Sequence, residues 1–195
     1  MPLLPANALD RVLTWNDFNR RTLPTPAPGV FAIAAQTAVG LNLGPLRLVP
    51  LPGSGTRRFR IGAEPSVTVN FDRARSWVAA FLFGWPRAEQ DALLGHEQTH
   101  YLIGALLARD LFRELAVLQR RDYPSTAAGL QEVRAVQARF SQALMQAVHD
   151  KYDRDTRHDP VHHPMAQSLW TGTVQAARQF DQPLRDYLGR ARLLP

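Results

Sequence analysis

The strongest constraint on this chain is a long segment without proline. No proline occurs between Pro86 and Pro124, and large apolar side chains and two histidines recur there every three or four residues. That spacing is typical of an α-helix, which an internal proline would break. Because the segment is apolar on more than one side, we expect a helix at the centre of the molecule, running to about Arg121. The residues that define the spacing are Leu93, His96, His100, Ile103, Leu107, Leu111, Leu115 and Leu118.

The residues before Pro86 predict strands. Residues 1–29 are interrupted by prolines and indicate an extended segment, anchored by Trp15 and Phe18. Between residues 30 and 71, short runs of alternating apolar and polar side chains are separated by turns that contain glycine and proline. This pattern favours a small, mainly antiparallel sheet. The predicted strands are 30–33, 46–49, 58–61 and 67–71, with a further one at 76–78.

Two further helices are predicted after the central one. The second begins near Ser125 or Thr126, either of which can cap it, and carries an apolar stripe to Tyr152. The third covers residues 165–188, with a bend at Pro183. The fold class is therefore α+β in one domain. Its regions are an extended segment (1–29), a sheet region (30–85) and a helical region (86–195).

Composition excludes several classes of protein. The chain has no cysteine, so it has neither disulfides nor thiolate metal sites. The longest apolar run, residues 78–85, is far shorter than the roughly 20 residues of a membrane-spanning helix. The net charge of +6 permits binding to nucleic acid or an acidic partner. Because the basic residues are dispersed and no nucleic-acid-binding motif occurs, we do not expect nucleic acid as a partner.

One motif in the central helix indicates metal chemistry. Residues 96–100 read His96-Glu97-Gln98-Thr99-His100, the H-E-x-x-H pattern. Residues four apart lie on one helical face, so both imidazoles can bind one zinc ion at about 2.0–2.1 Å. Glu97 then lies beside a zinc-activated water and accepts its proton as the general base of a hydrolysis.

The third zinc ligand must come from another element. The extended pattern H-E-x-x-H-x-x-G-x-x-H is excluded, because Ile103 and Leu106 occupy its last two positions. Asp110 and Glu114 would lie roughly 15 and 21 Å along the helix from the motif, which is too far. The second helix, if it packs antiparallel to the first, brings residues 152–163 back to the motif. We predict His158 as the third ligand, with Asp155, His162 and His163 as alternatives.

Further landmarks accompany the zinc motif. They are residues 15–18, 76–78, 94–101, 152–158 and 167–170. Together they resemble a bacterial family of unknown function, whose members are commonly described as predicted secreted zinc-dependent proteases. Its pattern is H-E-Q-x-H, then Y-D-x-x-T-x-H-G, then Q-x-x-W. The resemblance implies a zincin-like fold, a zinc-dependent protease activity, His158 as the third ligand, and export. Asp159 departs from it, because the family has a glycine there that would suit a turn with positive φ.

These observations predict a zinc metallohydrolase, specifically a peptidase with a peptide or protein substrate. The alternatives are a zincin relative that has lost catalysis, and a basic binding module with a structural metal. The resemblance implies a periplasmic or secreted protein, whereas the absence of a basic-then-apolar leader favours the cytoplasm. Substrate sequence and oligomeric state stay open.

Neighbouring residues have predicted supporting roles. Asp153 and Asp155 are candidates to orient a ligand histidine. The candidates to stabilise an oxyanion are Tyr152, Arg157, His162 and His163. His149 is interpreted as a structural residue beside the apolar stripe.

Overall fold

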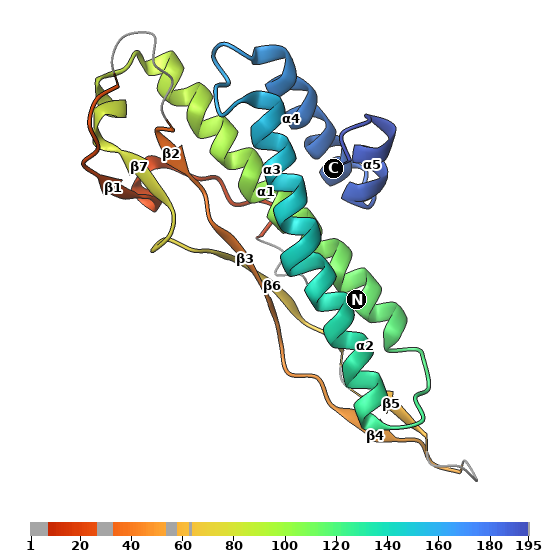
Figure 1. The fold of residues 1–195 in the computed structure, drawn as a ribbon. Helices are drawn as coiled ribbons and strands as arrows, with labels where there is room; N and C mark the ends of the chain where they lie inside the picture. Colours follow the sequence, from red (N-terminus) through yellow and green to blue (C-terminus); the bar gives the residue numbers. More distant parts are fainter. Residues whose placement is uncertain (1–7, 27–32, 54–57, 63, 195) are drawn as a thin grey trace.

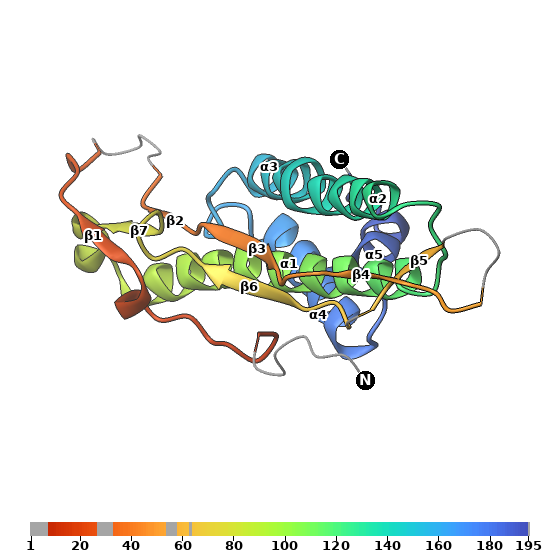
Figure 2. The same ribbon diagram turned by 90° about the horizontal axis from the view of Figure 1, so that it is seen from below.

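The fold is organised around one long helix. The computed structural model describes residues 8–26, 33–53, 58–62 and 64–194. Helix α1 (Arg87–Leu118) has 32 residues, and every residue from 101 to 112 is buried. Figures 1 and 2 show strands along one side of α1 and the other helices packed beside it. The prediction of a central helix is confirmed.

A second helical rod returns along α1. It consists of α2 (Thr126–Ala138), a π-helical turn (Arg139–Leu144) and α3 (Met145–Thr156). Ser125 caps α2, because its Oγ accepts a hydrogen bond from the backbone N–H of Ala128 at 3.1 Å. The rod runs antiparallel to α1 (Figure 1), as the short connection predicts. The end of α3 therefore lies beside the H-E-x-x-H turn.

The third predicted helix is in fact two helices. α4 (Pro164–Gln179) and α5 (Leu184–Arg190) are separated by a turn in which Asp181 has a φ of 50°. The prediction of one bent helix over 165–188 is therefore wrong. Pro183 has no backbone N–H and disfavours helical geometry in the residue before it, so the chain begins a new helix after it.

Arg109, on α1, holds the turn between α4 and α5. Its Nη2 donates to the backbone carbonyl of Ala177 at 3.1 Å and to that of Gln182. Its Nη1 donates to the Asp181 carboxylate at 3.0 Å. A buried guanidinium needs such partners, because an unpaired charge away from water is costly. The turn is therefore tied to the middle of the central helix.

Replacing Asp110 with asparagine should change how stability depends on pH. Asp110 Oδ2 accepts a hydrogen bond from the backbone N–H of Leu184 at 2.8 Å, and the side chain is 7% exposed. Burial raises the pKa of Asp110 to about 6. Between about pH 4 and pH 6 the Asp110 carboxyl is protonated in the folded chain and ionised in the unfolded chain. Its contribution to stability is therefore full below about pH 4 and is lost as the pH rises through about 6.

The asparagine amide keeps the hydrogen bond and does not titrate. Relative to this variant, the free energy of unfolding of the wild type should fall by about 3 kcal/mol between about pH 4 and pH 7, as measured by chemical denaturation. The same substitution at Asp91, whose side chain is 52% exposed on α1, controls for the loss of one charge. A difference between wild type and Asp110→Asn that stays constant over this pH range would contradict the prediction.

The strands of the described residues form three small sheets. The first sheet contains β1 (Asn19–Arg21), β7 (Trp77–Ala79) and β2 (Ala35–Gln36), in that order. The second sheet pairs β3 (Val39–Leu43) with β6 (Val67–Phe71). The third sheet pairs β4 (Leu48–Pro50) with β5 (Phe59–Ile61). All pairs are antiparallel except β1 with β7. β3 and β6 contact α1, and β4 and β5 contact α2. The α+β class is confirmed, whereas the prediction of one sheet is wrong.

The predicted strands match part of this set. Those at 46–49, 58–61, 67–71 and 76–78 correspond to β4, β5, β6 and β7. The one at 30–33 lies outside the described residues except for Ile33, which is in no strand. β3 was not predicted, because its Gly40 and Asn42 are residues with low strand propensity. Pairing with β6 along all five of its residues holds it extended.

The N-terminal segment lies extended against the helical motif. Leu13 and Phe18 are buried, and Trp15 is partly buried in a short 3₁₀ turn. The backbone N–H of Leu13 donates to Gln98 Oε1 at 2.7 Å, so the residue between the two motif histidines anchors this segment. The described residues of this segment contain a turn at 8–10, the 3₁₀ turn and β1. None of the described helices is long and apolar enough to cross a membrane.

Candidate metal centre

His96 and His100 lie one turn apart on α1, toward α3. Their side chains are buried, at 1% and 7% exposed. The two Nε2 atoms are 3.2 Å apart, and the rings meet edge to face with their centroids 4.8 Å apart. The four-residue spacing therefore brings both imidazoles to one point, as the motif predicts.

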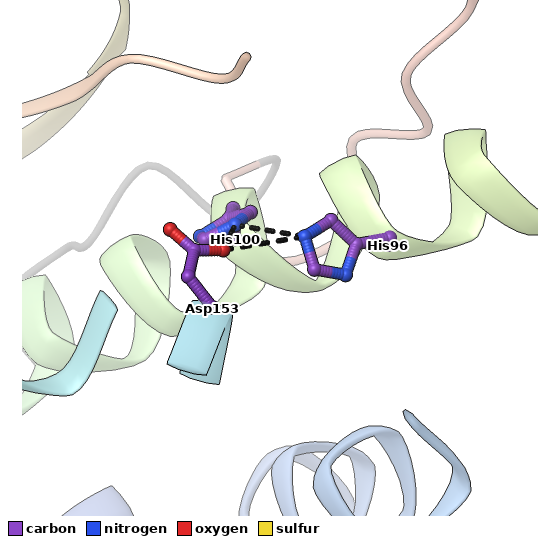
Figure 3. A group of neighbouring side chains, drawn as sticks. All are labelled: His96, His100 and Asp153. Carbon is purple, nitrogen blue, oxygen red and sulfur yellow. Dashed lines mark hydrogen bonds and ion pairs between the residues drawn. The ribbon is translucent and has the colours of Figure 1, made fainter. Parts of the chain in front are cut away.

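Asp153 of α3 completes a group of three ligand atoms (Figure 3). Its Oδ1 lies 2.7 Å from His100 Nε2 and 3.3 Å from His96 Nε2. The three atoms all lie within 4.8 Å of one another. Two ligand atoms on a tetrahedral zinc ion, each about 2.0–2.1 Å from the metal, are about 3.3 Å apart. The group could hold a metal ion, and two of its three separations are close to that value.

His158, the predicted third ligand, borders this group. Arg157 ends α3 in the left-handed region with a φ of 55°, and His158 follows with a φ of 52°. These two residues turn the chain back, so that His158 Nδ1 lies 3.2 Å from Asp153 Oδ1. The His158 ring centroid is 6.0 Å from that of His96. Asp153, which the sequence suggests as an orienting carboxylate, is the residue that forms a group with the two motif histidines.

The alternative third ligands have other partners. Asp155, two residues after Asp153, lies on another face of the helix, where its carboxylate pairs with Lys151 at 2.9 Å and accepts from Trp170 Nε1 at 3.0 Å. His162 is 78% exposed and pairs with an Asp159 carboxylate oxygen at 2.8 Å. His163 occupies the N-cap position of α4.

The departure at Asp159 does not strain the backbone. Among the described residues, Asp159 is not one of those with positive φ, and the left-handed positions of this turn are Arg157 and His158. The residues with positive φ therefore come one and two places before position 159. The Asp159 carboxylate instead accepts a hydrogen bond from the backbone N–H of His162 at 3.1 Å, which helps to close the turn before α4.

Gln167 of α4 sets the proton position of His96. Its Oε1 lies 3.0 Å from His96 Nδ1 and accepts a hydrogen bond from the Tyr152 hydroxyl at 2.9 Å, while its Nε2 donates to Thr171 Oγ1 at 2.9 Å. The carbonyl oxygen only accepts, so His96 Nδ1 carries the proton and the lone pair of Nε2 faces the ligand group. Burial raises the pKa of Tyr152, which keeps its hydroxyl a neutral donor. Because this hydroxyl is buried against Gln167, it is not free to stabilise an oxyanion.

His149 of α3 contacts His100 on the side away from the ligand group. The two Nδ1 atoms are 2.7 Å apart, and the ring planes differ by 11°. Burial and the neighbouring His100 lower the pKa of His149 to about 3, so the ring is neutral at pH 7. The sequence interpretation of His149 as only structural missed this contact. The signal that could have found it is the four-residue spacing of His149 and Asp153, which places both on one helical face.

Neighbouring charges of opposite sign counter the effect of burial on the pKa values of Asp153 and His100. Burial alone would raise the pKa of Asp153, but the hydrogen bond from His100, the contact with His96 and the charges of His100 and His158 hold it well below its usual range. Burial alone would lower the pKa of His100, but the hydrogen bond and charge of Asp153 outweigh it and raise it. Burial lowers the pKa of His158. The Asp153 carboxylate is therefore a partly buried anion that a proton or a metal cation can neutralise.

Glu97 lies beside this group without a hydrogen-bond partner of its own. Its side chain is buried, and Oε2 has no partner among the described residues. Glu97 lines a cavity of about 270 Å³ together with His100, Asp153 and His158 on the helical side and Trp77 on the strand side. The described residues that line this cavity include none of the four oxyanion candidates. A buried unpaired carboxylate oxygen is costly, so a ligand in this cavity would satisfy it.

Comparison of the chain with protein-family models, with curated proteins and with solved structures gives no match.

Proposed function

We propose that this chain is a zinc-dependent hydrolase of zincin-like fold that cleaves peptide bonds, with zinc held by His96, His100 and Asp153. The donor set supports zinc, because two neutral imidazoles and one carboxylate are the ligands of many catalytic zinc sites. His158 borders the site and positions Asp153 through its Nδ1 contact at 3.2 Å. The resemblance in the sequence supplies the substrate class.

The observation that carries this proposal is the position of Glu97. Glu97 lines the cavity that His100 and Asp153 also line, and its Oε2 has no hydrogen-bond partner among the described residues. When bound, zinc supplies a Lewis acid and lowers the pKa of a water molecule. Glu97 accepts the proton of the water that attacks the substrate carbonyl and passes it to the leaving amine. Its burial excludes bulk water from this exchange.

The proposal is tested on the full chain purified without chelator. We expect one zinc per chain by elemental analysis. Zinc at 100 times its Kd should stabilise the fold by about 2.7 kcal/mol, which is about 5–10 °C in Tm for a chain of this size. A mixed peptide library incubated with the protein should show cleavage that stops with chelator and returns with zinc. Absence of zinc uptake, or cleavage that chelator leaves unchanged, would exclude the proposal.

A further inference from the structure

The contact between His100 and His149 joins two nitrogen atoms that share one proton. The Nδ1 atoms lie 2.7 Å apart, so one must donate and the other must accept. The other nitrogen of His100, Nε2, faces His96 and Asp153. The direction of the hydrogen bond between the two Nδ1 atoms therefore decides which nitrogen of His100 keeps a lone pair for a metal ion.

Met145 determines this direction. His149 Nε2 lies 3.1 Å from Met145 Sδ, one turn earlier on α3. A thioether sulfur has no proton to give, so His149 Nε2 carries the hydrogen and donates it. A neutral imidazole has one N–H, which leaves His149 Nδ1 as an acceptor. His100 Nδ1 therefore carries the proton between the rings. A metal ion would replace the proton that His100 Nε2 donates to Asp153, and the Nε2 lone pair would then face the metal.

We propose that His149 is a positioning residue: it accepts the Nδ1 proton of His100 and so holds the Nε2 lone pair of His100 toward the zinc ion. The inference rests on the proposed function. It adds that the two motif histidines are oriented by different partners, since a glutamine carbonyl oxygen orients His96 and a neutral imidazole orients His100. A neutral partner raises the basicity of a ligand histidine less than a carboxylate does, which keeps the bound metal more electrophilic.

Two substitutions at one position test the proposal. His149→Leu removes the acceptor and keeps an apolar side chain of similar size. His149→Asn restores it, because the Asn Oδ1 occupies nearly the place of His Nδ1. We expect His149→Leu to weaken zinc binding by about 10–100-fold, which is the usual effect of losing a residue that orients a ligand, and His149→Asn to recover most of that loss. Competition with a chromophoric chelator measures the Kd, and thermal unfolding of the metal-free variants shows whether each is folded.

A spectroscopic readout separates this role from packing. In the zinc-loaded wild type, long-range ¹⁵N–¹H correlation of the histidine rings should show His100 protonated at Nδ1 and His149 protonated at Nε2. Wild-type zinc affinity in folded His149→Leu, or a His149 ring protonated at Nδ1, would overturn the inference while leaving the proposed function intact. Failure of the wild type to bind zinc would overturn both.

Discussion

Replacing Glu97 with glutamine should lower kcat/KM for peptide hydrolysis by about 10²–10⁴-fold, the usual contribution of a general base. Glutamine has nearly the same shape as glutamate but cannot accept a proton from water at neutral pH. Zinc affinity should stay near that of the wild type, because Glu97 is not one of the three grouped ligand residues. Zinc content, zinc Kd and initial rates on the same cleaved peptide are measured for both proteins.

The matched control for this experiment is Glu114→Gln. Glu114 is on the same helix, is 46% exposed and pairs with Arg139, away from the cavity. The Glu114→Gln substitution should leave both zinc affinity and kcat/KM unchanged. Full activity in Glu97→Gln would show that another group takes the proton. Loss of zinc together with activity would show that Glu97 holds the site rather than the water.

Replacing Asp153 with asparagine should raise the zinc Kd by about 100–1,000-fold. Structural zinc sites bind with about 10–16 kcal/mol over four ligands, so one ligand accounts for about 3 kcal/mol. The asparagine side chain is neutral and cannot balance the charge of the ion. His158→Ala should have the smaller effect of about 10–100-fold, because His158 contacts the group through Asp153.

Asp150→Asn is the control, since Asp150 lies one turn earlier on α3, lines the same cavity and is exposed. It should leave the Kd unchanged. All Kd values are measured by competition with a chromophoric chelator. The reverse order, with His158→Ala more damaging than Asp153→Asn, would assign the third position to His158, as the sequence predicts.

The local pattern was sufficient for the central helix and the motif. The absence of proline and the three-to-four-residue spacing predicted α1, because a helix repeats every 3.6 residues whatever surrounds it. The same regularity placed His96 and His100 on one face and excluded Asp110 and Glu114 as ligands. Local chemistry alone predicted a cap at Ser125 or Thr126, and the structure has it at Ser125.

The strands and the breaks in the helices were less predictable. β3 contains glycine and asparagine and is extended because β6 pairs with it. The end of α4 depends on Arg109, whose hydrogen bonds reach Ala177 and Gln182 from a distant part of the chain. Such contacts override local propensity, and nothing in a short window of sequence encodes them.

The motif alone determined two candidate ligands and a candidate base, because all three belong to one turn of helix. Only the tertiary structure decided their partners. Asp153 and His149 come to the motif because α3 packs antiparallel to α1, and Gln167 because α4 packs on both. Along the chain His158 is the better zinc ligand by residue type, yet Asp153 is the residue that forms a group with His96 and His100 in space. Which side chain reaches the two motif histidines depends on where α3 ends, at Thr156, and on the two left-handed residues that follow. The end of the helix and this turn together determine which residues of the segment face α1.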